Sequence, residues 1–167
     1  MRMDDGFDAV YESYVRAVHA YLVRLTGNRA TADDLCQETF VRYLRHRDRL
    51  REGNGALGSW LFRVATNLAF DDRRKRRPDL VDVEPIARHG DALKEAESRD
   101  LVARISIEIA KMPDELRAAF LLRTQHEMTF PRMATVLGCS ERTAKDRYRK
   151  ARDVLAGRLD PLLREDS

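Results

Sequence analysis

Apolar residues recur every three or four positions along most of this chain, which places them on one face of an α-helix. The first stripe occupies residues 7–25 and is followed by a Gly-Asn stop signal. A second stripe occupies residues 32–44, with Thr31 placed as its N-cap. A third occupies residues 60–68, with Ser59 placed as its N-cap. The pattern therefore predicts three amphipathic helices in the first part of the chain.

A second helical part follows an acidic stretch that contains few apolar residues. This stretch, residues 78–100, reads as a linker with a helical end. After it, Ile105, Ile107 and Ile109 alternate as in a β-strand, although the surrounding apolar positions also fit a helix. Because the sequence offers no partner strand, we expect a helix here. Another helix is expected to begin at Pro113, since proline is well tolerated in a first helical turn.

Residues 129–155 carry the most specific local signal. Thr129 caps a short predicted helix, a tight turn follows at residues 138–140, and Ser140 caps the next helix. On that helix the residues pointing away from the apolar stripe are Arg142, Asp146, Arg149 and Lys150. Two short helices joined by a three-residue turn, with the second basic on its free face, indicate a DNA-binding helix-turn-helix. An ordinary helical hairpin is the alternative.

The composition indicates a folded protein without a membrane span. Of the 167 residues, 35% are charged and 43% are hydrophobic. The longest unbroken apolar run, residues 118–122, is too short to cross a bilayer, and no secretory signal opens the chain. Cys36 and Cys139 lie far apart, which excludes a disulfide framework and a cysteine-based zinc site. We therefore expect a cytoplasmic protein.

Charge is divided unevenly along the chain. Residues 1–77 hold 15 Lys and Arg against 11 Asp and Glu, a net +4. Residues 78–100 hold 3 against 7, a net −4, and residues 101–167 hold 13 against 10, a net +3. Two basic parts around an acidic connector suggest two modules that could each meet a polyanion. Solvated helix faces would give the same distribution.

Four runs of the sequence resemble, in their order and spacing, the extracytoplasmic-function (ECF) sigma factors of the sigma-70 family of bacterial RNA polymerase subunits. The runs are residues 34–40, 60–74, 111–117 and the helix-turn-helix. The resemblance implies an all-α fold of two small helical domains joined by a flexible linker. Its expected boundaries are residues 1–77 for sigma region 2, 78–100 for the linker and 101–167 for sigma region 4.

The first run is similar to the helix with which the family binds polymerase. The residues that the resemblance assigns to this contact are Asp34, Leu35, Gln37, Glu38 and Phe40. Asp34, Gln37 and Glu38 stand at i, i+3 and i+4, which puts their acceptor groups on one helix face, as a basic partner helix requires. Without the resemblance, the same residues would read as an ordinary solvated polar face.

The second run is similar to the helix that opens and reads the −10 promoter element. The residues assigned to this role are Trp60, Arg63, Asn67, Phe70, Arg73 and Arg74. Asn67 offers a donor and an acceptor to a base edge, Phe70 offers an apolar ring for stacking, and the basic run would hold phosphates. A solvated domain boundary is the alternative for the basic run, and a core position is the alternative for Trp60.

The helix-turn-helix is similar to the −35 reader of the family. Its assigned residues are Ser140, Arg142, Thr143, Lys145, Asp146, Arg149 and Lys150. Asp146 replaces the small hydroxyl residue usual in the family, and it could accept from a cytosine amino group or pair with Arg142 or Arg149 to aim a guanidinium at guanine. Pro131 and Arg132 stand where the family usually has an acidic pair. Both departures put the −35 consensus in question, but not the role.

The sequence thus predicts an alternative sigma factor without a catalytic site, cofactor or metal. The partners that the resemblance implies are core RNA polymerase, through its β′ clamp and β flap, promoter DNA, and an anti-sigma factor, with no membrane insertion. A conventional helix-turn-helix regulator that acts without polymerase is the alternative, and a helix-helix adaptor ranks below it. An enzyme is disfavoured because the histidines are scattered, with His126 expected in a loop.

Overall fold

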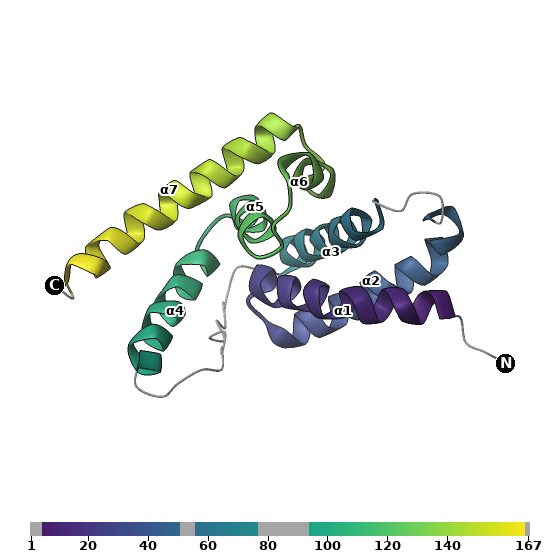
Figure 1. The fold of residues 1–167 in the computed structure, drawn as a ribbon, viewed down its shortest axis with the longest axis horizontal. Helices are drawn as coiled ribbons and strands as arrows, with labels where there is room; N and C mark the ends of the chain where they lie inside the picture. Colours follow the sequence, from purple (N-terminus) through teal and green to yellow (C-terminus); the bar gives the residue numbers. More distant parts are fainter. Residues whose placement is uncertain (1–4, 51–55, 77–93, 166–167) are drawn as a thin grey trace.

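The computed structural model describes residues 5–50, 56–76 and 94–165, which form seven α-helices and no strand (Figure 1). The helices are α1 (Asp5–Thr26), α2 (Arg29–Leu50), α3 (Ala56–Lys75), α4 (Lys94–Ala110), α5 (Asp114–Thr124), α6 (Phe130–Leu137) and α7 (Glu141–Glu165). The all-α prediction is confirmed. Along these described ranges, none of the helices combines the length and the apolar character needed to cross a membrane.

Helices α1, α2 and α3 pack into a first module, whose apolar stripes meet as predicted. Val18, Leu22, Phe40, Leu61 and Ala65 are all buried at the centre of this module. Aromatic rings join the helices, with Tyr11 of α1 lying edge-on to Phe40 of α2 at a centroid distance of 4.9 Å. Leu44, predicted to lie on the buried stripe of α2, is instead 47% exposed.

Two predicted helix starts are wrong, both by a few residues. The α2 helix begins at Arg29, and the side-chain oxygen of Asn28 accepts a hydrogen bond from the backbone N–H of Thr31 at 2.9 Å. Asn28 is therefore the cap, and Thr31 is buried inside the first turn. The α3 helix begins by Ala56, so Ser59 also lies inside a helix and is buried. Residues 51–55, between α2 and α3, lie outside the described residues.

The second module contains α4 to α7. The isoleucine-rich segment is helical, with Ile109 buried, and α4 begins at Lys94, inside the helical end expected for the linker. Pro113 is the N-cap of α5, so this helix begins at Asp114, one residue after the predicted start. Residues 77–93, which hold the rest of the predicted linker and Arg77, lie outside the described part of the chain.

The helix-turn-helix has the predicted form. Thr129 occupies the N-cap position of α6, although its side chain makes no capping bond, and Gly138 ends this helix with a left-handed φ of 62°. Such a φ is strained for residues with a Cβ, which explains glycine at this turn. Ser140 caps α7 by accepting from the backbone N–H of Thr143 at 3.1 Å. Ala144 and Ala151 are buried on the inner face of α7.

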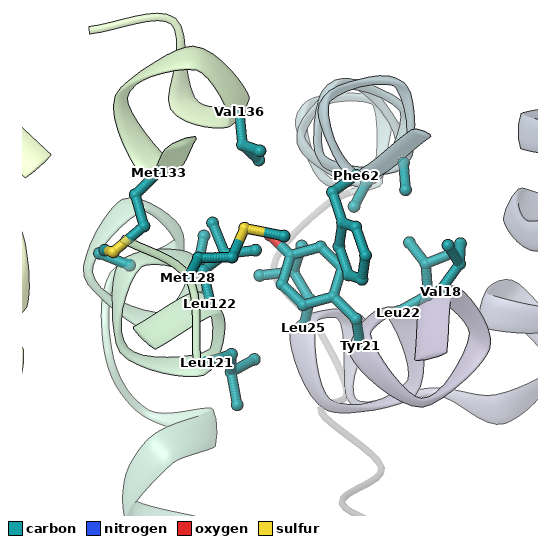
Figure 2. Close-up of a cluster of buried hydrophobic side chains, with 14 of the residues drawn as sticks. Val18, Tyr21, Leu22, Leu25, Phe62, Leu121, Leu122, Met128, Met133 and Val136 are labelled. Carbon is teal, nitrogen blue, oxygen red and sulfur yellow. The ribbon is translucent and has the colours of Figure 1, made fainter. Parts of the chain in front are cut away.

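The two modules pack against each other through one continuous hydrophobic cluster. Figure 1 shows α5 and α6 beside α1 and α3, with α7 lying across the outside. In the close-up of the cluster, Tyr21 and Phe62 of the first module face Met128 and Val136 of the second (Figure 2). The interior of the molecule therefore includes the boundary between the modules.

Candidate nucleic-acid and protein interfaces

The polar face of α2 is only partly engaged within the chain. Asp34 and Gln37 are exposed, and Glu38 forms an ion pair with Arg42 one turn later, at 3.0 Å. Beside them, Asp33 lies 2.5 Å from the imidazole of His19 on α1. The face therefore presents acceptors at one-turn spacing to solvent, next to the exchangeable ion pair of Glu38 with Arg42.

The two apolar residues assigned to the same contact lie deeper. Leu35 is half-buried, and Phe40 is almost completely buried against Tyr11. Cys36 between them is buried, and burial together with the negative charge of Asp33 raises the pKa of its thiol to about 11. Phe40 is thus a packing residue of α2, and the polar side chains form the accessible part of the predicted contact.

Of the α3 residues predicted to read the −10 element, some lie on the surface and others pack against the core. Arg63 and Asn67 are exposed, one helical turn apart, while Phe70 is half-buried against the core. Trp60 is also half-buried, with its ring 6.4 Å from Tyr43 and 6.2 Å from His46. The exposed pair therefore forms the accessible centre of this face.

Carboxylates accompany the basic end of α3. Arg74 pairs with Asp71 at 3.7 Å and Arg76 with Asp72 at 3.0 Å, both along the helix surface. Arg73 instead reaches the second module, where it lies 3.2 Å from Asp114 at the start of α5. Because these pairs are partly exposed, each contributes little to stability and can be exchanged for a phosphate.

The outer face of α7 carries the cations predicted for DNA contact. Arg142, Arg149 and Lys150 are exposed on it, opposite the buried alanines. Asp146 lies 3.7 Å from Arg149, which is one of the two intrahelical pairs that the sequence suggested. Lys145 pairs with Glu141 at 3.3 Å and also lies over the Phe130 ring. Ser140 and Thr143 share a hydrogen bond at 2.8 Å at the start of the helix.

Sequence reasoning gave no role of its own to Arg117, which is the largest fully buried side chain described and is 1% exposed. Its guanidinium donates to the carbonyls of Ile109 at 3.0 Å and Met112 at 2.8 Å, and also to that of Ala110. A further bond of 2.6 Å reaches the Leu25 carbonyl at the end of α1. The sequence signal that could have indicated this buried role was the position of a charged residue, Arg117, on an otherwise apolar stripe of α5.

His126 and Arg132 also join the modules, which their sequence context did not indicate. His126 lies in the predicted loop, with its ring 4.8 Å from Phe62 and 5.7 Å from Tyr21. Burial, together with the positive charge of Arg24, lowers the pKa of His126 to about 4. Arg132 donates to the Ser59 hydroxyl at 3.3 Å.

The buried groups around this junction favour their neutral forms, apart from the guanidinium of Arg117. Burial raises the pKa of the Tyr21 hydroxyl well above its usual value, and this hydroxyl shares a hydrogen bond of 2.8 Å with Thr66. Burial lowers the pKa of Arg117 to about 10, so its charge is kept at neutral pH. Among the described residues, no three or more metal-ligating side chains gather in one place.

Comparison with known families adds an independent line of evidence. The family described as Sigma-70 region 2 matches residues 10–78, and Sigma-70, region 4 matches residues 108–155. The RNA polymerase sigma-H factor of Pseudomonas aeruginosa is 33% identical over 96% of this chain and 89% of its own length. The ECF RNA polymerase sigma factor EcfG of Rhodopseudomonas palustris is 31% identical over 87% of this chain and 80% of its own.

Solved structures show the same fold. The sigma factor RpoE of Bartonella quintana, solved in complex with the anti-sigma factor NepR, superposes with a TM-score of 0.77 at 20% identity. That match covers 94% of this chain and 98% of the other. CnrH, solved with the cytosolic domain of CnrY, gives a TM-score of 0.69 at 24% identity, over 93% of this chain and 88% of the other. The chain described here belongs to the sigma-70 family of RNA polymerase sigma factors, and within it to the ECF group.

Proposed function

We propose that this alternative sigma factor docks on core RNA polymerase through α2, captures the −10 element with α3 and anchors on the −35 element with α7. The observation that carries the proposal is the division of α7 into two faces. Ala144 and Ala151 are buried, whereas Arg142, Arg149 and Lys150 are exposed together. A helix that follows a tight turn and presents such a face fits the major groove of DNA.

Docking on polymerase rests on the acceptors of α2. Asp34, Gln37 and Glu38 fit a partner helix rich in basic residues, such as the clamp of the β′ subunit. The ion pair between Glu38 and Arg42 is exposed and is worth about 0–1 kcal/mol, so a cation of the partner can replace Arg42 at little cost.

Reading of the −10 element rests on α3. Asn67 can donate to and accept from the edge of an unpaired base, with Arg63 beside it for the backbone. Phe70 and Trp60 are half-buried, so they would contact a base through the exposed edges of their rings. Arg73 and Arg74 exchange their carboxylate partners for phosphates when DNA binds, and this step supplies the salt-dependent part of the affinity.

Reading of the −35 element rests on the pair of Asp146 and Arg149. The carboxylate holds the guanidinium from one side at 3.7 Å, which supports the interpretation that Asp146 aims Arg149 at a guanine. Arg142 and Lys150 contribute phosphate contacts on either side, and the β flap of polymerase contacts this module. Ser140 and Thr143 fix the start of α7.

We also propose that the protein is cytoplasmic. It has no catalytic residues of its own in this proposal, because polymerase carries out the chemistry. An anti-sigma factor is the expected regulator, and the Bartonella relative was solved with one. The surfaces it would cover are the polymerase-binding and DNA-binding faces.

Run-off transcription with purified core polymerase, on promoters randomised at both elements, tests these assignments. Wild-type protein should select defined −10 and −35 sequences. Asn67→Ala should relax one −10 position, at a cost of about 1–3 kcal/mol, and leave the −35 preference unchanged. Asp146→Ser should alter one −35 position and leave the −10 preference unchanged.

Each variant serves as the control for the other. If Asn67→Ala lowered transcription from every promoter equally, its role would be positioning and not base reading. An unchanged −35 preference in Asp146→Ser would reject the aiming role. Binding to duplex DNA without any transcription by core polymerase would instead support a conventional regulator.

A further inference from the structure

The side chain of Phe130 lies where three helices of the second module meet. Phe130 is the first residue of α6 and is half-buried against the hydrophobic cluster. The centroid of its ring lies 6.0 Å from that of Tyr148 on α7, and the Tyr148 ring lies 6.4 Å from that of Phe120 on α5. The position of the Phe130 ring is therefore fixed by packing against α7, which itself packs on α5.

Two cations lie over this ring. The guanidinium carbon of Arg123, in the last turn of α5, is 4.6 Å from the ring centroid, and the ammonium of Lys145 on α7 is 5.6 Å from it. Both distances fall within the range in which the face of an aromatic ring attracts a cation. We use the term cation platform for Arg123, Phe130 and Lys145.

Neutral groups hold the guanidinium of Arg123 in place. Besides the ring, it contacts the carbonyl of Met128, to which Nη1 donates at 2.8 Å. Within the described part of the chain, no carboxylate lies within ion-pair distance of Arg123. By contrast, Arg42, Arg76 and Arg149 each pair with a carboxylate. Because a carbonyl and a ring restrict the guanidinium without cancelling its charge, Arg123 keeps its full attraction for an external anion.

Lys145 places the cation platform beside the proposed −35 face of α7. Lys145 and Arg149 are one turn apart on this helix, and both side chains are exposed. Lys145 pairs with Glu141 at 3.3 Å, but both partners are about half exposed, so a phosphate can replace the carboxylate at little cost. The platform therefore extends the basic surface of α7 to the end of α5, where the sequence pattern indicated no DNA-binding residue.

We propose that Phe130 is a positioning residue of the −35 reader, which holds Arg123 and Lys145 for the phosphate backbone beside the bases that α7 reads. The inference rests on the −35 role proposed for α7. Long basic side chains lose conformational freedom when they are ordered, so holding them before DNA arrives lowers the entropic cost of the contact. Because phosphate contacts carry no sequence information directly, the platform contributes affinity and orientation, not selection of bases.

Removal of the ring tests the positioning role. Each variant is assembled with core polymerase, and its binding to a fluorescent duplex carrying the selected −35 sequence is measured at several salt concentrations. Phe130→Leu keeps an apolar side chain at the start of α6, and it should weaken binding about three- to tenfold. The slope of log affinity against log salt concentration should become shallower by about 1–2, because one or two phosphate contacts are lost. The preferred −35 sequence should stay unchanged.

Phe120→Leu is the matched control. It removes another half-buried ring that packs on Tyr148 but lies outside the cation platform, so it should bind as wild type does. Phe130→Tyr keeps an aromatic face for the two cations and should also retain the affinity of wild type. Thermal unfolding checks that each variant is folded.

A double-mutant cycle separates positioning from packing. In a background of Arg123→Ala and Lys145→Ala, Phe130→Leu should have no further effect on affinity, because no cation remains for the ring to hold. An equal loss from Phe130→Leu in both backgrounds would overturn the positioning role. Arg123→Ala alone should weaken binding more than Arg152→Ala, which removes an exposed cation of α7 that pairs with Asp153 at 3.8 Å. Equal effects of these two substitutions would exclude Arg123 as a phosphate contact.

Failure of the cation platform and failure of the −35 role give different results. If no protein of the series, wild type included, prefers the −35 duplex over a scrambled duplex, the −35 role of α7 is overturned, and the inference with it. If wild type prefers the −35 duplex and Phe130→Leu matches it in affinity and in salt slope, only the inference is overturned.

Discussion

At the scale of single residues, Arg117 connects the modules through the backbone. Four carbonyls, from the end of α1 and from the turn between α4 and α5, accept hydrogen bonds from its buried guanidinium. Such a charge is tolerated in the interior only because its donors are satisfied. Its planar fork can span several carbonyls, which a lysine ammonium cannot.

Arg117→Met should therefore lower the free energy of unfolding by about 3–5 kcal/mol, because the hydrogen bonds from Arg117 to four carbonyls are lost. The free energy of unfolding of Arg117→Lys should lie between those of Arg117→Met and wild type. Urea unfolding followed by circular dichroism measures both. Arg152→Met is the control, with an expected change within about 0.5 kcal/mol. A loss below about 1 kcal/mol in Arg117→Met would contradict this role.

His126 makes the stability of the molecule depend on pH. Burial, followed by the charge of Arg24, lowers its pKa to about 4, against about 6.5 in an unfolded chain. Between these values the unfolded state binds more protons, so stability decreases as the pH falls through this window. No hydrogen-bond partner for its buried Nε2 lies within the described residues.

His126→Gln should flatten this dependence. Unfolding at pH 7 and pH 5 should show that wild type loses about 1–2 kcal/mol more than the variant, after allowance for partial solvent screening. The exposed His46 provides the control, because His46→Gln should keep the wild-type response. Equal pH responses of wild type and His126→Gln would exclude His126 as the group responsible.

At the scale of helices, the apolar periodicity predicted well which segments are helical. It predicted poorly the residues at which these helices begin. The stripes of α1, α3 and α7 followed from local spacing, and so did the exposure of Arg63, Asn67 and the α7 cations. Both wrong starts followed from assigning a cap to the nearest hydroxyl residue. Asn28 and Thr31 are both residue types that favour an N-cap, and the turn at Gly27 places Asn28, not Thr31, at the start of α2.

At the scale of the whole molecule, local patterns do not specify which surface covers an apolar face. Tyr21, Leu25 and Phe62 fit the core of the first module, and sequence periodicity does not distinguish that role from contact with a second module. The same ambiguity concealed Arg132, whose partner lies 73 residues away. The packing of the two modules against each other therefore emerges only from the three-dimensional fold.

Association with core RNA polymerase tests the central claim most directly. Glu38→Lys reverses an exposed charge at the centre of the α2 acceptors, and its loss of one surface pair should change stability by only about 0.5 kcal/mol. Glu12→Lys makes the same reversal at an exposed position of α1. When each tagged protein is purified with core polymerase, wild type and Glu12→Lys should retain the enzyme and Glu38→Lys should lose it. Retention of core polymerase by a folded Glu38→Lys protein at the wild-type level would contradict docking through α2.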